Sequence, residues 1–163
     1  MPINHLYHTW IRQIKEMQPD QQITRIRNMV WLMIGIYQSR SVYLSRVAGK
    51  IPGQAKLLSI TRRLSRFLAN PAIQVRAWYE PVARAWLEAQ YQSCKEVHLI
   101  IDGTKVGFGH QLLMVGLAYR KRAIPIAWIW INHVKGHSRS EQQLALLRHI
   151  RGLIPQNAPV FLV

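Results

Sequence analysis

Residues 97–104 read VHLIIDGT, and this stretch decides the fold of the second half of the chain. Its first five positions carry valine, leucine and isoleucine around one histidine, a composition typical of a buried β-strand. Asp102 closes the apolar run and is followed by glycine. The pattern therefore predicts a central strand with a carboxylate at its end.

Two more strand-like runs follow, at residues 110–119 and 124–133. The basic segment at residues 120–123 joins them. So short a link favours antiparallel pairing, although it is longer than the tightest hairpin turns. The three runs together predict an antiparallel meander.

A helix and a fourth strand are predicted after the meander. Ser138 and Glu141 have the spacing of a capping box, and an amphipathic pattern continues from them to Gly152. Residues 159–163 form another apolar run, and a helix between two strands usually connects parallel neighbours. Three strands, a helix and a fourth strand are the leading order of a ribonuclease-H-like fold.

The first half of the chain differs, because helical periodicity there is interrupted by proline and glycine. It predicts five helices, near residues 4–17, 20–38, 42–49, 55–69 and 74–91. We therefore expect an α/β protein. An all-α helical region at residues 1–94 is followed, at residues 95–163, by an incomplete ribonuclease-H-like core.

The helix expected at residues 55–69 has an apolar face and a basic face. The apolar residues are Leu57, Ile60, Leu64, Phe67 and Leu68. The opposite side carries Lys56, Ser59, Arg63 and Arg66, with Arg62 at its edge. Arginine offers two parallel donors to a phosphate or a guanine, so Lys56, Arg62, Arg63 and Arg66 are predicted to bind DNA. The alternative is a solvated basic face.

Two further features favour nucleic acid as the partner. Residues 41–53 predict a short helix and a tight turn before the basic helix, which is a helix-turn-helix-like arrangement. The chain has 22 Lys and Arg against 7 Asp and Glu, a formal net charge of +15. A phosphate backbone relieves this self-repulsion and releases counterions, whereas an anionic membrane surface ranks second. Hydrophobic residues make up 49% of the chain, so the charge is not that of a disordered segment.

The sequence also predicts a cytoplasmic protein without a membrane span. The single cysteine, Cys94, excludes an intrachain disulfide, and residues 1–10 lack the basic start and apolar core of a signal peptide. The longest apolar run, residues 29–37, is about half the length of a membrane-spanning helix.

Metal-dependent cutting of a phosphodiester needs two or more converging carboxylates that hold two divalent ions about 4 Å apart. Among the 7 acidic residues, only Asp102 ends a buried-type strand. An ordinary turn at Gly103 is the alternative explanation for Asp102, and a helix cap with Ser138 is the alternative for Glu141. The histidines near the expected strand ends lack metal-ligand spacing; they are His110, His133 and His137.

Several segments resemble bacterial insertion-sequence transposases of the DDE class. The first catalytic strand and following meander of that family are similar to LIIDGT, LLMVGLAY, RAIPIAW and KGHS at residues 99–104, 112–119, 122–128 and 135–138. Its N-terminal region is similar to SVYLS and RRLSRFL at residues 41–45 and 62–68. The likeness therefore covers most of the chain.

The resemblance implies an enzyme that binds the double-stranded terminal repeats of its element and uses two Mg²⁺ (or Mn²⁺) ions to cut and rejoin DNA. Asp102 would be catalytic and the first of three metal-binding acids. Lys105, Arg122 and Lys135 are expected to contact phosphates around it. The second Asp and the Glu of the family lie beyond residue 163, so we expect a truncated chain that is inactive alone and binds metal only in full-length form. The resemblance leaves open whether copies of the chain form a homo-oligomer.

Three other functions also stay open. The chain would serve as a non-catalytic DNA-binding module or regulator, as a compact ribonuclease-H-like nuclease using Asp102 and Glu141, or as a structural RNA-binding protein. Its positive charge fits each of them.

Overall fold

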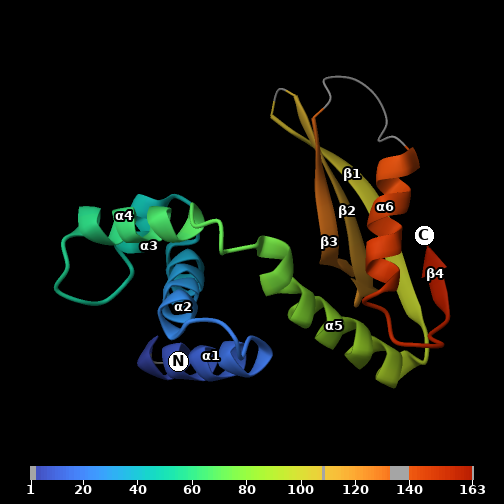
Figure 1. The fold of residues 1–163 in the computed structure, drawn as a ribbon, viewed down its shortest axis with the longest axis horizontal. Helices are drawn as coiled ribbons and strands as arrows, with labels where there is room; N and C mark the ends of the chain where they lie inside the picture. The colour runs from blue at the N-terminus through green and yellow to red at the C-terminus, as the bar shows by residue number, and fades with distance from the viewer. Residues whose placement is uncertain (1–2, 108, 133–139, 163) are drawn as a thin grey trace. The chain divides into compact units, whose positions relative to one another are not determined.

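A computed structural model describes residues 3–107, 109–132 and 140–162. In these residues the chain forms six helices and one four-stranded sheet, so the predicted α/β class is confirmed (Figure 1). The chain divides into two compact units, Met1–Trp78 and Tyr79–Val163. No helix in the described ranges is both long enough and apolar enough to cross a membrane.

The first unit is all helical. It contains α1 (Ile3–Met17), α2 (Ile23–Ser39), α3 (Leu44–Ala48), α4 (Leu57–Leu68) and the start of α5 (Val75–Cys94). The five predicted helices are confirmed, with small shifts at their ends. The largest shifts are three residues, at the start of α2 (expected at residue 20) and at the end of α5 (expected at residue 91), and α3 is shorter than the helix expected at residues 42–49.

Helix α2 organises the first unit because its residues enter two adjoining core clusters. Ile26, Val30 and Ile34, spaced four residues apart, are fully buried beside Trp78 and are covered by α1. The second core joins α2 to α3 and α4; its buried members are Leu32, Val47, Ala48, Ile51, Ile60, Leu64 and Phe67. Because α4 contributes one face to this core, its opposite face is left for solvent.

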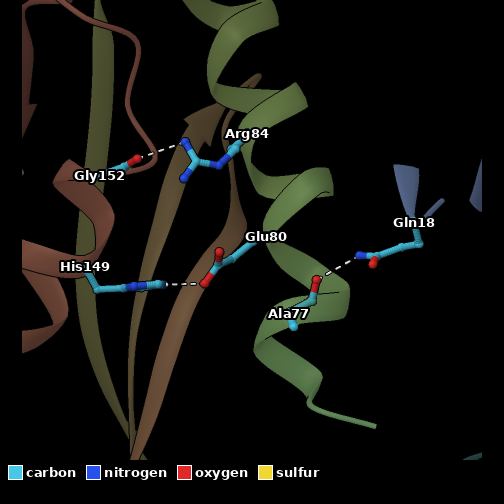
Figure 2. A network of polar contacts seen from close by, with 6 residues as sticks. All are labelled: Gln18, Ala77, Glu80, Arg84, His149 and Gly152. Atoms are coloured by element: carbon cyan, nitrogen blue, oxygen red, sulfur yellow. Dashed lines mark hydrogen bonds and ion pairs between the residues drawn. The ribbon is translucent and has the colours of Figure 1, made fainter. Parts of the chain in front are cut away.

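A proline interrupts the backbone hydrogen bonding of α5. Pro81 has no N–H, so the carbonyl of Ala77 lacks its usual intrahelical donor. The side chain of Gln18 replaces that donor, because its Nε2 donates to the Ala77 carbonyl at 2.8 Å (Figure 2). Helix α5 therefore continues through the proline with this carbonyl satisfied.

The second unit contains the sheet. The strands β1 (Val97–Val106), β2 (His110–Tyr119) and β3 (Arg122–Asn132) form the predicted antiparallel meander. After α6 (Ser140–Arg151), β4 (Val160–Leu162) pairs in parallel with β1. The strand order is β3-β2-β1-β4 (Figure 1), so the predicted order of elements and the parallel fourth strand are confirmed.

Two predictions about this sheet are wrong. Strand β1 does not end at Asp102 but continues to Val106, which pairs with His110 of β2. The link between β2 and β3 is a two-residue turn, with φ of 45° at Arg120 and 62° at Lys121, as the tightest hairpins require. In both places, pairing with β2 extends the neighbouring strand beyond its apolar run.

Helices α5 and α6 cover the same face of the sheet. Buried residues of both helices belong to one core cluster with the inward residues of β1, β2 and β3; the helical members are Ala83, Leu87, Leu146 and Ile150. The division predicted from the sequence lies between residues 94 and 95, whereas the compact units divide between Trp78 and Tyr79. The difference arises because most of α5 packs on the sheet.

Two polar contacts join α5 to α6 in the second unit (Figure 2). The imidazole of His149 lies 3.4 Å from the carboxylate of Glu80, and both side chains are partly buried. Arg84 Nη1 donates to the carbonyl of Gly152 at 2.8 Å, just beyond the C-terminus of α6. A cation is favourable there because helix C-terminal carbonyls carry partial negative charge.

Tyr79 links α5 to β3. Its hydroxyl donates to the carbonyl of Pro125 at 2.5 Å, and its ring contacts the edge of Trp128 with centroids 5.1 Å apart. Burial raises the pKa of the Tyr79 phenol, because the charged phenolate loses more hydration than the neutral form.

Candidate nucleic-acid interface

Helix α4 separates apolar and basic side chains as predicted. Ile60, Leu64 and Phe67 are at most 5% exposed and lie in the second core of the first unit. The opposite side carries the exposed residues Arg62, Arg63 and Arg66, and Lys56 is exposed at the N-cap. Leu57 and Leu68, also predicted on the apolar face, are instead 52% and 50% exposed.

The basic face of α4, defined as Lys56, Arg62, Arg63 and Arg66, is not neutralised by its surroundings. No other described residue forms a hydrogen bond or an ion pair with these four side chains. The first unit also has only two of the 7 acidic residues, Glu16 and Asp20. The guanidinium groups are therefore available to phosphate oxygens, with which arginine forms paired hydrogen bonds.

The connection before α4 is longer than predicted. It runs from residue 49 to residue 56, whereas helix-turn-helix motifs use about three or four residues. The expected tight turn is therefore wrong. Helices α3 and α4 still share the second core through Val47 and Leu64, so they pack together without that turn.

Sequence reasoning missed an exposed cluster just before α3. Val42 and Tyr43 are 77% and 68% exposed, and the guanidinium carbon of Arg46 lies 5.6 Å from the centre of the Tyr43 ring. The sequence places Val42, Tyr43 and Arg46 inside a helix predicted at residues 42–49, and the apolar pattern of that helix does not show that Val42 and Tyr43 are exposed. An aromatic ring paired with arginine is common where proteins contact nucleic acids.

Asp102 lies in the middle of β1, opposite Met114 of β2, and its side chain is exposed. Thr104 Oγ1 donates to its Oδ2 at 3.4 Å, which is a long hydrogen bond. The expectation of a carboxylate at a strand end is therefore wrong, and so is the alternative of a turn at Gly103. Because the Asp102 side chain is exposed to solvent, its charge needs no metal ion or ion-pair partner to offset a desolvation penalty.

Side chains alternate along β1, which places Asp102 on the face opposite the helices. Leu99 and Ile101 face the core with Leu117 and Val115, their partners in β2. We call the other side the open face. Its large side chains and polar residues are His98, Ile100, Asp102, Thr104 and Val106 of β1, His110, Leu112 and Met114 of β2, Trp128 and Trp130 of β3 and Phe161 of β4.

The described residues do not fit a two-metal centre. No group of three His, Cys, Asp or Glu side chains that could hold a metal ion occurs among them. Glu141 is exposed in the first turn of α6, and α6 covers the face opposite Asp102. Since carboxylates must converge to hold two ions, the described residues support no metal-catalysed step.

The remaining predicted contacts do not form one site. Lys105 is exposed in β1 opposite Gln111, and Arg122 is exposed in β3 opposite Tyr119. Gln111 and Tyr119 lie near opposite ends of β2, so the two cations are far apart along the sheet. Four residues named in the sequence analysis lie outside the described residues: His133, Lys135, His137 and Ser138.

No protein-family model, no curated protein and no solved structure matches this chain. The resemblance to DDE transposases therefore rests on the sequence motifs alone.

Proposed function

We propose that this chain binds double-stranded DNA through the basic face of α4, as the DNA-binding part of a transposition protein of the DDE class. The observation that carries the proposal is the division of α4 itself: one face is anchored in a core and the other presents unneutralised arginines. The sequence motifs that resemble DDE transposases supply the biological context.

The physical basis for binding is electrostatic. Each Lys or Arg that neutralises a DNA phosphate releases a condensed counterion, and this release favours binding at low salt. The four basic side chains on α4 lie within four turns of one helix, a length similar to the stretch that a helix lays in the major groove. Contacts to phosphates give affinity, and any sequence preference comes from arginine contacts to base edges.

For catalysis, the proposal concerns one residue, Asp102. Asp102 is proposed as one metal-binding acid of a ribonuclease-H-like core, since β1, β2, β3, α6 and β4 follow the leading order of that fold. Mg²⁺ or Mn²⁺ would supply the activation of a nucleophile in such a core. We assign no cutting step to the described residues, because Asp102 belongs to no group of three or more His, Cys, Asp or Glu side chains among them that could hold a metal ion.

The second candidate is a DNA-binding module or regulator that does not cut. It is favoured by the same isolation of Asp102. The two candidates share duplex binding and differ only in strand cleavage.

A pair of measurements tests these proposals. A mobility-shift titration compares duplex DNA from the ends of the element with a scrambled duplex, at several salt concentrations. Tighter binding of the end sequence supports a transposition protein, and equal binding of both contradicts it. Incubation of the bound duplex with Mg²⁺ or Mn²⁺ then separates the candidates: strand cleavage that is lost in Asp102→Asn supports the enzyme, and intact DNA supports the module.

A further inference from the structure

One leucine lies among the basic side chains of α4. Leu58 is the second residue of this helix, and its side chain is 58% exposed. It belongs neither to the second core of the first unit nor to the side chains packed against that core. A single exposed leucine is ordinary on a protein surface, so its position on the helix decides whether it has a role.

Leu58 lies opposite the buried side of α4, unlike the other two exposed leucines of this helix. At about 100° per residue, Leu57 and Leu68 lie about 50° and 70° from the centre of the three buried side chains. Leu57 also lies near the end of α3, because its Cδ1 would be 3.8 Å from a Cβ at Gly49. Leu58 lies about 150° from the same centre. Its exposure is therefore not that of a residue at the edge of the core.

The neighbours of Leu58 on the helix surface are cationic. Arg62 lies four residues after Leu58, so the two side chains are adjacent. Arg66 follows one turn later, and Lys56 is exposed at the N-cap. The first turn of α4 contains no acidic residue. This charge favours a polyanionic ligand over Leu58 and disfavours the same basic face of a second copy.

We infer that Leu58 contacts the C5-methyl group of thymine in the major groove of duplex DNA. The inference rests on the proposed binding of duplex DNA by α4 and assigns a sequence preference to it. The thymine methyl is the apolar group that base edges present in the major groove, where the other groups are hydrogen-bond donors and acceptors.

Leu58 and the arginines would have different effects on binding. Phosphate contacts give affinity without sequence preference. Recognition helices place their N-terminal residues against base edges, and Leu58 lies in the first turn of α4. A leucine against a methyl group removes apolar surface from water, whereas a leucine against a base donor or acceptor leaves that polar group without a hydrogen bond. Leu58 is therefore a specificity-determining residue that favours an A·T pair at the position it reaches.

Replacement of thymine by uracil removes only the methyl group from the base and tests the inference. Anisotropy titrations of the full chain use two labelled DNA duplexes of about 20 base pairs, with alternating adenine and thymine or alternating adenine and uracil. Every base pair of the first duplex carries a thymine methyl, so the binding register does not matter. The wild type should bind the thymine duplex about fourfold more tightly, the effect of burying one methyl group.

Three variants assign this difference to a position on α4. Leu58→Ala keeps helix propensity and should bind both duplexes equally. Leu58→Met keeps a long apolar side chain and should retain most of the difference. Leu68→Ala is the matched control, because it removes a 50% exposed leucine from the other end of α4 and should keep the wild-type ratio. An effect of uracil on the duplex itself would appear equally in every variant.

The outcomes separate this inference from the proposed function. Equal binding of both duplexes by the wild type overturns the inference and leaves duplex binding by α4 intact, whereas binding of neither duplex refutes both. The inference is also overturned if Leu58→Ala keeps the wild-type ratio, or if Leu68→Ala loses it to the same extent. Conversion of a dimer to a monomer by Leu58→Ala in light scattering would assign Leu58 to a contact between copies and would overturn it as well.

Discussion

Replacing Arg62, Arg63 and Arg66 together with glutamine removes three positive charges from α4 while keeping its helix propensity. The three side chains are exposed and have no bonded partner among the described residues, so the fold should be retained. Each phosphate contact contributes about 0.9 to the slope of log affinity against log salt concentration. Three contacts therefore contribute about 2.7 to that slope.

This slope gives a measurable difference that does not depend on absolute affinity. A fourfold rise in salt changes log salt by about 0.6, so three contacts account for about a 40-fold loss of affinity over that rise. We expect the wild type to lose about 40-fold more affinity for duplex DNA than the triple variant does. Anisotropy titrations at several salt concentrations measure both slopes, and circular dichroism checks that the variant is folded.

The control variant tests position against total charge. Arg12, Arg27 and Arg76 are also exposed residues of the first unit, and replacing them with glutamine removes the same net charge. If the basic face of α4 binds phosphates, the control slope should stay close to the wild-type slope. Equal slopes for wild type and triple variant, or an equal fall in the control, would refute a phosphate-binding role for α4.

Four further changes test the structure and the site. Leu64→Ala, at a fully buried position, should lower the free energy of unfolding in urea by about 2–5 kcal/mol, and a loss below 1 kcal/mol would contradict the packing of α4. Arg84→Ala removes the donor to the Gly152 carbonyl and should lower the free energy of unfolding by about 1 kcal/mol or less. An unchanged free energy of unfolding would contradict a stabilising role for this hydrogen bond. Burial raises the pKa of Tyr79, so the unfolded state releases the phenol proton at lower pH than the folded state. The contribution of this group to the free energy of unfolding is therefore fully present below pH 10.0 and falls as the pH rises further. In Tyr79→Phe this fall should be absent. Asp102→Asn should change the free energy of unfolding by no more than about 0.5 kcal/mol because the carboxylate is exposed, and a larger loss would indicate a structural role.

The long elements of this fold are predictable from sequence because their periodicity extends over many residues. The apolar spacing in α4 identifies Ile60, Leu64 and Phe67 as buried, and all three are. Arginines between them are exposed for the same reason, since few charged side chains are buried without a partner. The basic face of α4 can therefore be predicted from the sequence alone.

The ends of elements are less predictable because partners distant in sequence determine them. The Asp-Gly pair at residues 102–103 is typical of a turn, yet hydrogen bonds from β2 extend β1 to Val106. The proline in α5 is similar, since local rules predict a break at Pro81. Only the fold brings Gln18 to the carbonyl that the proline leaves free.

The aromatic part of the open face could not be identified from sequence. Residues 127–131 read AWIWI, so both faces of β3 are apolar and alternation does not show which one is covered. Tryptophan is usually expected in a core. The register of β3 on β2 places Trp130 on the face opposite the core that α5 and α6 share with the sheet, where its side chain is exposed.

The bond from Gln18 to the Ala77 carbonyl has a consequence for how homologous chains should vary. Selection for a glutamine at position 18 exists only while position 81 is proline, because any other residue at 81 restores the backbone donor. Related sequences with a non-proline residue at 81 should therefore tolerate drift at position 18. Those that keep the proline should retain a side-chain amide, so the two positions should covary although they are separated by more than sixty residues.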